Sequence, residues 1–156
     1  MTAAGAVLQK ITKPKAQPLP VIWDDDVPVR FLLNLHKKHR PENQRVWMMR
    51  HEQAVKRLVY AEVNIHQLQQ LHGHLTIYPG RILYWQSVLE KGDPFGVLYC
   101  WPSKVKLPDG LGSKFAWRVM DGNHRRKVLL AAGIDKVRIA YDPERLKKLG
   151  LNGLAN

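Results

Sequence analysis

The segment from Arg118 to Tyr141, RVMDGNHRRKVLLAAGIDKVRIAY, constrains the fold of this chain more than any other part of it. Its first residues read as the end of a strand, and Asp121-Gly122 follows with no linker. The apolar run Val128–Ala132 then stops at Gly133, a residue that suits the end of a helix, and VRIAY is rich in residues that favour strands. The pattern predicts a strand that runs straight into a helix, with a second strand, Val137–Tyr141, after it.

The start of this predicted helix is basic. Its first turn holds Asn123 and His124, followed by two arginines and a lysine. Cations at a helix N-terminus oppose the helix dipole and cost about 0.3–1 kcal/mol each when exposed, so stability alone favours acidic residues there. Free amide groups together with cationic side chains form a site for an anion, and phosphate is the anion we expect. The alternative is that these residues are simply a solvated face of a basic protein.

The remaining pattern completes a mixed order of strands and helices. Further strands are predicted at Val27–Leu33, Phe95–Trp101 and Phe115–Met120, and helices across Val46–Leu71, across Arg81–Lys91 and after Asp142-Pro143. The acidic run 24–26 is predicted as a solvated turn, and 36–45 and 102–114 as loops. Because strands and helices interleave around one antiparallel hairpin, we expect an α+β fold with a small mixed β-sheet flanked by helices.

The charge of the chain favours anionic partners. Lysine and arginine number 25 against 13 acidic residues, a formal net charge of +12. Such a surface attracts polyanions, with nucleic acid and nucleotide phosphates first and an anionic membrane second. We expect residues 1–22 to form a basic flexible N-terminal arm, 23–142 the folded domain, and 143–156 a short C-terminal helix and tail. The single cysteine excludes an internal disulfide and fits the cytoplasm, and no apolar run approaches the roughly 20 residues of a membrane span.

The segment DGNHRRKVLLAAGI followed by VRIAY resembles the signature of the ParB/sulfiredoxin superfamily. In that family a strand leads into a Gly-x-His-Arg or Gly-Glu-Arg-Arg turn that opens a helix ending at glycine. Gly122, His124 and Arg125 match the sulfiredoxin turn, and the span from Gly122 to Gly133 matches that of partition ParB proteins. More weakly, VPVRFLL with HRPENQR is similar to the first ParB box.

Two departures narrow what the resemblance implies. Asn123 replaces the nucleophilic cysteine of sulfiredoxins, and Cys100 lies in a predicted buried strand, so we do not expect sulfinic reductase activity. Only fifteen residues follow Tyr141, so we expect a single-domain member without the DNA-binding and dimerisation domains of partition ParB proteins.

The resemblance then implies a nucleotide-binding hydrolase, an ATPase with metal-dependent DNase activity. Small members of the family include a plasmid protein that suppresses DNA transfer by a competing conjugation system, so a protein partner in a DNA-transfer system is also implied. A non-catalytic DNA-binding module and a small-molecule (amino-acid) kinase of the same fold are the alternatives.

The resemblance also implies roles for individual residues. The phosphates of ATP or another nucleotide, or of DNA, are expected at the turn that opens the helix, on Gly122, Asn123, His124, Arg125 and Arg126. Catalysis is assigned to His124 and Arg125 with a carboxylate base, for which Glu42 is the first candidate and Glu90 and Asp93 follow. Asp121 is expected either to hold Mg²⁺ or another divalent cation or to cap the helix.

Overall fold

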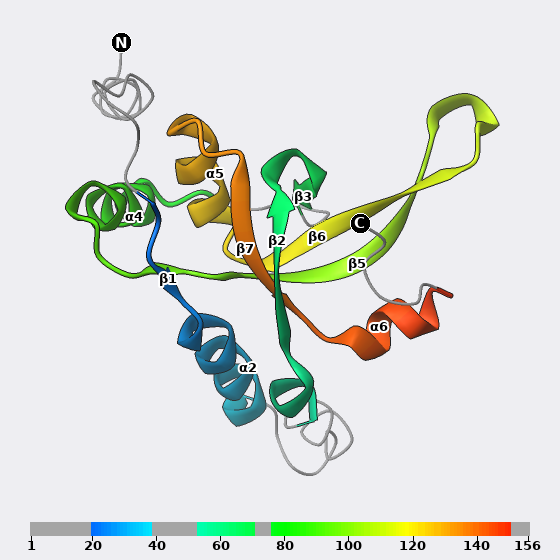
Figure 1. Ribbon diagram of the computed structural model, residues 1–156, viewed down its shortest axis with the longest axis horizontal. Helices are drawn as coiled ribbons and strands as arrows, with labels where there is room; N and C mark the ends of the chain where they lie inside the picture. The colour runs from blue at the N-terminus through cyan, green and yellow to red at the C-terminus, as the bar shows by residue number, and fades with distance from the viewer. Residues whose placement is uncertain (1–19, 39–52, 71–75, 151–156) are drawn as a thin grey trace.

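The computed structural model describes residues 20–38, 53–70 and 76–150, and within them the chain forms a five-stranded mixed sheet with helices packed against it (Figure 1). The strands are β1 (Trp23–Asp24), β2 (Val59–Asn64), β3 (Leu68–Gln70), β4 (Phe95–Gly96), β5 (Leu98–Lys106), β6 (Ser113–Asp121) and β7 (Lys136–Tyr141). The helices are α2 (Asp26–Lys38), α4 (Pro79–Lys91), α5 (Asn123–Ala131) and α6 (Pro143–Lys148), with 3-10 turns at Ile65–Gln67 and Pro108–Gly110.

The sheet order is β2-β7-β5-β6-β3. β5 pairs with β6 antiparallel and with β7 parallel, while β2 joins β7 antiparallel and β3 joins β6 parallel. A separate short parallel pair joins β1 to β4. The predicted α+β class and the predicted hairpin between β5 and β6 are therefore confirmed. The predicted loop 102–114 is wrong over most of its length, because β5 runs to Lys106 and β6 begins at Ser113.

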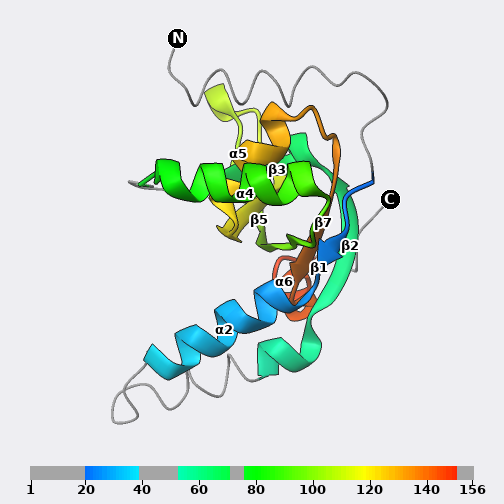
Figure 2. The same ribbon diagram turned by 90° about the vertical axis from the view of Figure 1, so that its left-hand side faces the viewer.

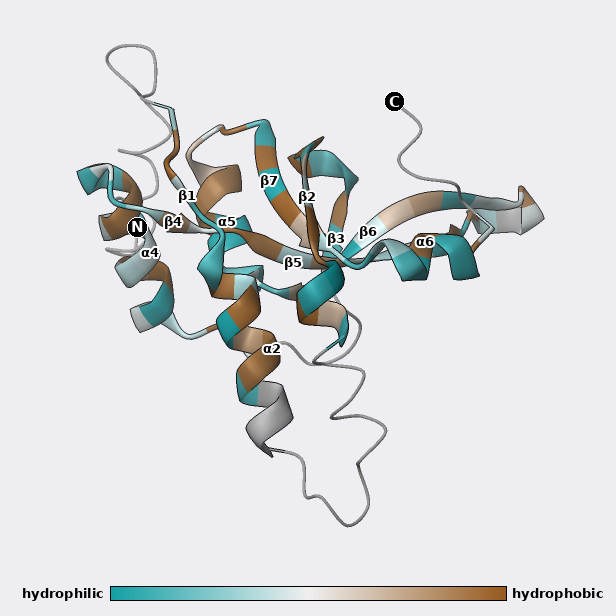
Figure 3. Cartoon of the chain, turned by 60° about the horizontal axis from the view of Figure 1, so that its bottom comes forward, coloured by the Kyte–Doolittle hydropathy of each residue, from teal (hydrophilic) through white to brown (hydrophobic). Residues whose placement is uncertain are grey.

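Alternation along β5 divides the core into two clusters. Leu98 and Cys100 belong to the larger cluster, which also contains Val128 and Leu129 of α5, whereas Tyr99 belongs to the smaller cluster with Leu32 of α2. Figure 2 shows α4 and α5 lying against one another at one end of the sheet and α2 at the other. Figure 3 shows apolar segments gathered where β5, β7 and α5 meet.

The elements around the signature segment confirm the sequence predictions. The helix predicted at Arg81–Lys91 begins two residues earlier, at Pro79, and ends at Gly92, whose φ is 70°. The predicted strand, helix and strand of the signature are β6, α5 and β7, and Gly133 follows α5 with a φ of 73°. Periodicity and glycine stops were sufficient here because each element ends at a local backbone signal.

Two predictions for the first half of the chain are wrong. Val27–Leu33 lies in helix α2 rather than in a strand. Asp24, which we predicted to lie in a solvated turn, accepts a hydrogen bond from the amide of Asp26 at 3.0 Å just before the helix. Pro28 lies in the first turn, where a missing amide costs nothing. An acidic cap followed by an early proline is a helix-start signal, and it outweighed the strand propensity of the apolar residues.

The second error concerns the helix predicted across Val46–Leu71. Residues 53–57 are helical, but β2, a 3-10 turn and β3 follow. The sequence VYAEVN of β2 alternates, with Val63 buried and Glu62 and Asn64 exposed. Long-range pairing with β7 therefore overrides the apparent helical spacing. Of the predicted loop 36–45, residues 36–38 are the end of α2, and the rest lies outside the described residues.

Of the predicted N-terminal arm, residues 1–22, the structure describes only residues 20–22. The Phe95 amide donates a hydrogen bond to the carbonyl of Ile22 at 2.7 Å, and Val21 packs against the larger core cluster. These two residues therefore contact the folded domain. No helix in the described ranges has the length and apolar character needed to cross a bilayer.

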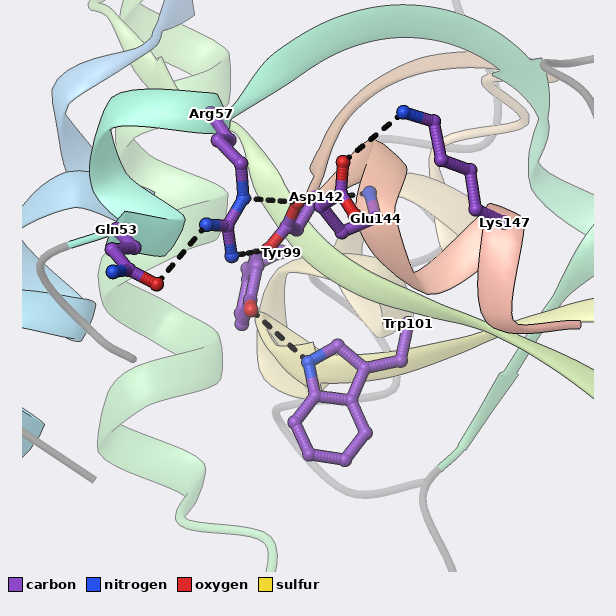
Figure 4. Close-up of polar contacts among 7 residues, drawn as sticks. All are labelled: Gln53, Arg57, Tyr99, Trp101, Asp142, Glu144 and Lys147. Atoms are coloured by element: carbon purple, nitrogen blue, oxygen red, sulfur yellow. Dashed lines mark hydrogen bonds and ion pairs between the residues drawn. The ribbon is translucent and has the colours of Figure 1, made fainter. Parts of the chain in front are cut away.

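The C-terminal helix is fastened to the domain through Asp142 (Figure 4). Its carboxylate accepts a hydrogen bond from the Glu144 amide at 3.0 Å and so caps α6 as predicted. The same carboxylate accepts two hydrogen bonds from Arg57, at 3.1 and 2.7 Å. Burial opposes ionisation of this group, but the hydrogen bonds from Arg57 and from the Glu144 amide outweigh it and hold the pKa of Asp142 below its usual value. One buried carboxylate thus joins α6 to residues 53–57.

We expect Asp142→Ala to lower the free energy of unfolding by about 1–3 kcal/mol, because it removes both a helix cap and a paired charge. Glu144→Ala, which removes only an exposed ion pair with Lys147, is the control and should cost less than about 0.5 kcal/mol. Urea denaturation measures both. Because the folded-state pKa of Asp142 is depressed, its contribution is present above about pH 3.8 and is lost as the pH falls below it. Equal effects of the two substitutions would contradict the assignment.

Candidate functional site

A hollow of about 270 Å³ opens where β6 ends and α5 begins. It lies in front of Gly122, the turn on which the sequence placed an anion site. The residues that line it are Thr76, Tyr78, Arg81, Met120, Asp121, Gly122, Asn123 and His124. Of the five predicted phosphate-binding residues, the structure therefore places Gly122, Asn123 and His124 at the hollow.

Gly122 makes the turn possible. Its φ is 115°, a backbone conformation that favours glycine. A Cβ added there would also meet the side chains of Leu98 and Arg125, the latter at Nη2 2.7 Å away. Gly122 is the N-cap of α5 and has no side chain, so no side-chain cap bonds the first amide groups of this helix.

Two helices begin at this hollow. The Tyr78 amide, at the start of α4, donates a hydrogen bond to Nε2 of His124 in the first turn of α5, at 3.0 Å. The rings of Tyr78 and His124 stack with centroids 6.0 Å apart. Neither helix has an acidic residue in its first turn. The positive ends of two helix dipoles therefore converge on one hollow with no carboxylate from either first turn to offset them.

Arg81 adds a full positive charge to the rim. It lies in the first turn of α4, is exposed, and its guanidinium lies 5.0 Å from the centre of the Tyr78 ring. The sequence pattern did not single out Tyr78 or Arg81. A signal for Arg81 was available, because it is a basic residue in the first turn of a predicted helix, as the cations of α5 are.

Arg125, predicted as a phosphate clamp, is instead buried beneath the turn. Its side chain is 3% exposed, and its Nη2 donates to Oδ2 of Asp121 at 3.1 Å. The guanidinium lies 5.2 Å from the centre of the Trp85 ring and against Gly96, where a Cβ would collide with it. Burial lowers the pKa of Arg125, against the opposing effect of Asp121. In this geometry Arg125 supports the floor of the hollow and does not line it.

Arg126 also lies outside the lining. Its guanidinium points toward β3, where Nη2 donates to the carbonyl of Leu68 at 3.4 Å. Its Nε is buried without a hydrogen-bond partner. Of the two arginines predicted to clamp phosphate, the structure places neither at the hollow.

Among the lining residues, Asp121 and Asn123 carry a side-chain carboxylate and a side-chain amide. Asp121 is the last residue of β6; the helix cap is Gly122, so the predicted alternative in which Asp121 caps α5 is wrong. Asn123 is buried, and its Nδ2 donates to the carbonyl of Val119 at 3.3 Å. Its Oδ1 is buried and has no partner. A buried acceptor without a partner costs about 1–3 kcal/mol, which a bound ligand or cation would recover.

His124 is held as a neutral imidazole. Burial lowers its pKa from the usual 6.5, and the positive charges of Arg81, Arg125 and Lys127 lower it further. Because Nε2 accepts the Tyr78 amide, the ring proton lies on Nδ1. His124 is therefore arranged as a hydrogen-bond donor, and transfer of a proton to a leaving oxygen would require the charged form that this environment opposes.

The two predicted carboxylate bases that the structure describes do not line the hollow. Glu42 lies outside the described residues. Glu90 and Asp93 are exposed near the far end of α4 and do not line it. Cys100 is fully buried, as predicted, and burial raises the pKa of its thiol well above the usual value. No group of three or more His, Cys, Asp or Glu side chains able to share a metal ion occurs among the described residues.

We expect Gly122→Ala to lower the free energy of unfolding by about 3 kcal/mol or more. The φ of this residue is unfavourable for alanine, and the added Cβ would displace the side chains of Leu98 and Arg125. Gly133→Ala is the control, since its φ is also positive but its Cβ would meet nothing within 4 Å. That variant should cost only about 1–2 kcal/mol. Chemical denaturation of both variants checks this. Similar losses would show that no close packing surrounds Gly122.

The pKa of His124 predicts a pH dependence of stability. Below about pH 6.5 the unfolded chain binds a proton that the folded imidazole resists, so the free energy of unfolding falls as the pH decreases. His124→Gln should flatten this dependence between about pH 7 and 5, as measured by urea denaturation. His66→Gln, at an exposed histidine away from the hollow, controls for loss of an imidazole. An unchanged pH profile in His124→Gln would refute the assignment.

Comparisons with protein-family models, with curated proteins and with solved structures find no match to this chain. Membership of the ParB/sulfiredoxin superfamily therefore stays a prediction from the sequence motif. What the structure adds independently is a hollow with two converging helix starts, one exposed arginine and one unpartnered amide oxygen.

Proposed function

We propose that this chain is a nucleotide-binding hydrolase of the ParB/sulfiredoxin type that binds nucleotide phosphates in the hollow before α5. The observation that carries the proposal is the meeting of two helix N-termini, free of acidic residues in their first turns, at one hollow lined by Arg81. A phosphate there would accept hydrogen bonds from the amides at the start of α5 and from the Arg81 guanidinium.

The neighbouring side chains would take distinct parts. Nδ1–H of His124 would donate to a phosphate oxygen, in keeping with its neutral state. Arg125 would act as a positioning residue, because it orients Asp121 and supports Gly122 from below. Tyr78, half exposed at the rim, would stack against the base of the nucleotide, a contact worth about 1–3 kcal/mol.

The oxygen atoms at the hollow fit Mg²⁺, the cation that the proposed family implies. Magnesium prefers oxygen ligands and is usually held by one or two carboxylates together with substrate phosphates. Asp121 and the unpartnered Oδ1 of Asn123 would hold it. When bound, the cation would neutralise charge on the phosphate under attack.

DNA is the polymeric substrate that we propose. The formal charge of +12 draws a polyanion to the surface, and the phosphate-binding groups of the hollow require no particular base.

Binding of ATP, measured by calorimetry with and without Mg²⁺, tests the first half of the proposal. We expect Arg81→Gln to weaken binding about 10- to 100-fold, because a charge-assisted hydrogen bond contributes about 1.5–3 kcal/mol. Asn123→Ala should weaken binding in Mg²⁺ more than in its absence. Lys91→Gln, at the opposite end of α4, removes the same charge and should bind as the wild type does.

Release of phosphate from ATP and nicking of plasmid DNA, both with Mg²⁺, test the second half. We expect Asp121→Asn to lose turnover, and circular dichroism of the same variant checks that the fold survives loss of the ion pair with Arg125. Binding of ATP or DNA without any product would contradict hydrolysis and favour the non-catalytic DNA-binding module. A phosphorylated small molecule in place of free phosphate would indicate a kinase. Unchanged ATP binding in Arg81→Gln would exclude the hollow as the site.

A further inference from the structure

The outer halves of β5 and β6 form a two-stranded ribbon that no other described strand joins. β7 pairs with β5 only at Leu98 and Tyr99, and β3 pairs with β6 only at residues 117–119. Residues 103–106 and 113–116 therefore pair only with one another among the described strands. Figure 1 shows this ribbon extending away from the rest of the sheet. We call residues 103–116 the ribbon.

The ribbon is cationic on both of its faces. Lys104 and Lys106 lie on one face, because residues two apart in a strand share a side, and Lys114 lies on the other, opposite Val105. All three lysines are exposed, and no described residue forms an ion pair with any of them. Asp109 is the one acidic residue in the ribbon sequence.

The ribbon is anchored at its base and closed at its end. The ring of Phe115 meets that of the buried Trp117 edge-on, with centroids 5.0 Å apart. The Leu107 amide donates to the carbonyl of Gly112 at 2.8 Å, which closes the turn, and Leu111 there is 75% exposed. The ribbon thus projects from the sheet with cations along its sides.

The major groove of B-form DNA is wide enough to receive such a ribbon. It is about 12 Å wide and 8.5 Å deep. That groove admits a two-stranded ribbon, and phosphates border it on both sides. The deep, narrow major groove of A-form RNA does not admit one.

We propose that the ribbon is a docking element for duplex DNA, inserted in the major groove with Lys104 and Lys106 facing the phosphates of one strand and Lys114 those of the other. The contacts are to phosphates, so binding is independent of base sequence. The ribbon and the hollow lie at opposite ends of β6, about 26 Å apart along the strand, and the proposal does not depend on hydrolysis at the hollow.

Fluorescence anisotropy with a short labelled DNA duplex of arbitrary sequence tests the proposal on the full chain. The variant Lys104→Gln/Lys106→Gln/Lys114→Gln removes three phosphate contacts, each worth about 0.9 in the slope of log affinity against log salt. Between about 50 and 200 mM salt, wild-type affinity should therefore fall about 40-fold more than that of the variant. The corresponding Lys→Arg variant should bind as the wild type does, provided that circular dichroism shows both variants folded.

The matched control is Lys91→Gln/Lys136→Gln/Lys148→Gln, which removes the same charge from exposed sites outside the ribbon. It should retain the wild-type affinity and salt slope. Equal losses in the two triple variants would overturn the proposal, because net charge alone would then explain binding. Equal affinity of the wild type for an RNA duplex, or binding to anionic phospholipid vesicles without binding to DNA, would overturn it as well.

The same protein preparations separate the ribbon from the hollow. The ribbon variant should bind ATP as the wild type does, because the ribbon lies at the opposite end of β6 from the hollow. Loss of duplex binding in Arg81→Gln with no loss in the ribbon variant would refute the ribbon and leave the hollow intact.

Discussion

The buried guanidinium of Arg125 is the contact on which the hollow depends. It occupies space that exists only because Gly96 and Gly122 lack side chains, and it is paired with Asp121 and packed over Trp85. Through these neighbours it joins β4, the end of β6 and helix α4 to the first turn of α5. A buried charge is tolerated only when it is paired, so Asp121 is fixed by the same requirement that keeps Arg125 inside the protein.

The first turns of α4 and α5 contain groups that are unfavourable by themselves and that a bound phosphate or cation would stabilise. Arg81 opposes the dipole of α4, whose positive end it adjoins, and the buried Oδ1 of Asn123 has no hydrogen-bond partner. A phosphate would relieve the first, and a divalent cation the second. The neutral His124 fits this arrangement, because another positive charge there would add to the repulsion.

Helix start and stop residues made the secondary structure of the second half of the chain predictable from the sequence. In the first half such residues allowed only part of the secondary structure to be predicted. Helices α4, α5 and α6 each have a clear start or stop in the sequence, such as Gly92 or Asp142. The strand β2 has none that competes with the apparent helical spacing around it, and it forms because β7 offers a partner edge. For α2 the cap was present in the sequence at Asp24, but the strand propensity of the following residues concealed it.

The sequence by itself determined the strand–helix–strand signature, the positive charge of the chain and the position of the glycine turn at Gly122. Those follow from backbone conformations and composition, which are properties of neighbouring residues. Only the tertiary structure decided which side chains face the hollow. It turned Arg125 inward, directed Arg126 toward β3, and brought Tyr78 and Arg81 to the rim from more than forty positions away. Side-chain direction depends on which partners and cavities surround a residue, and packing alone fixes these.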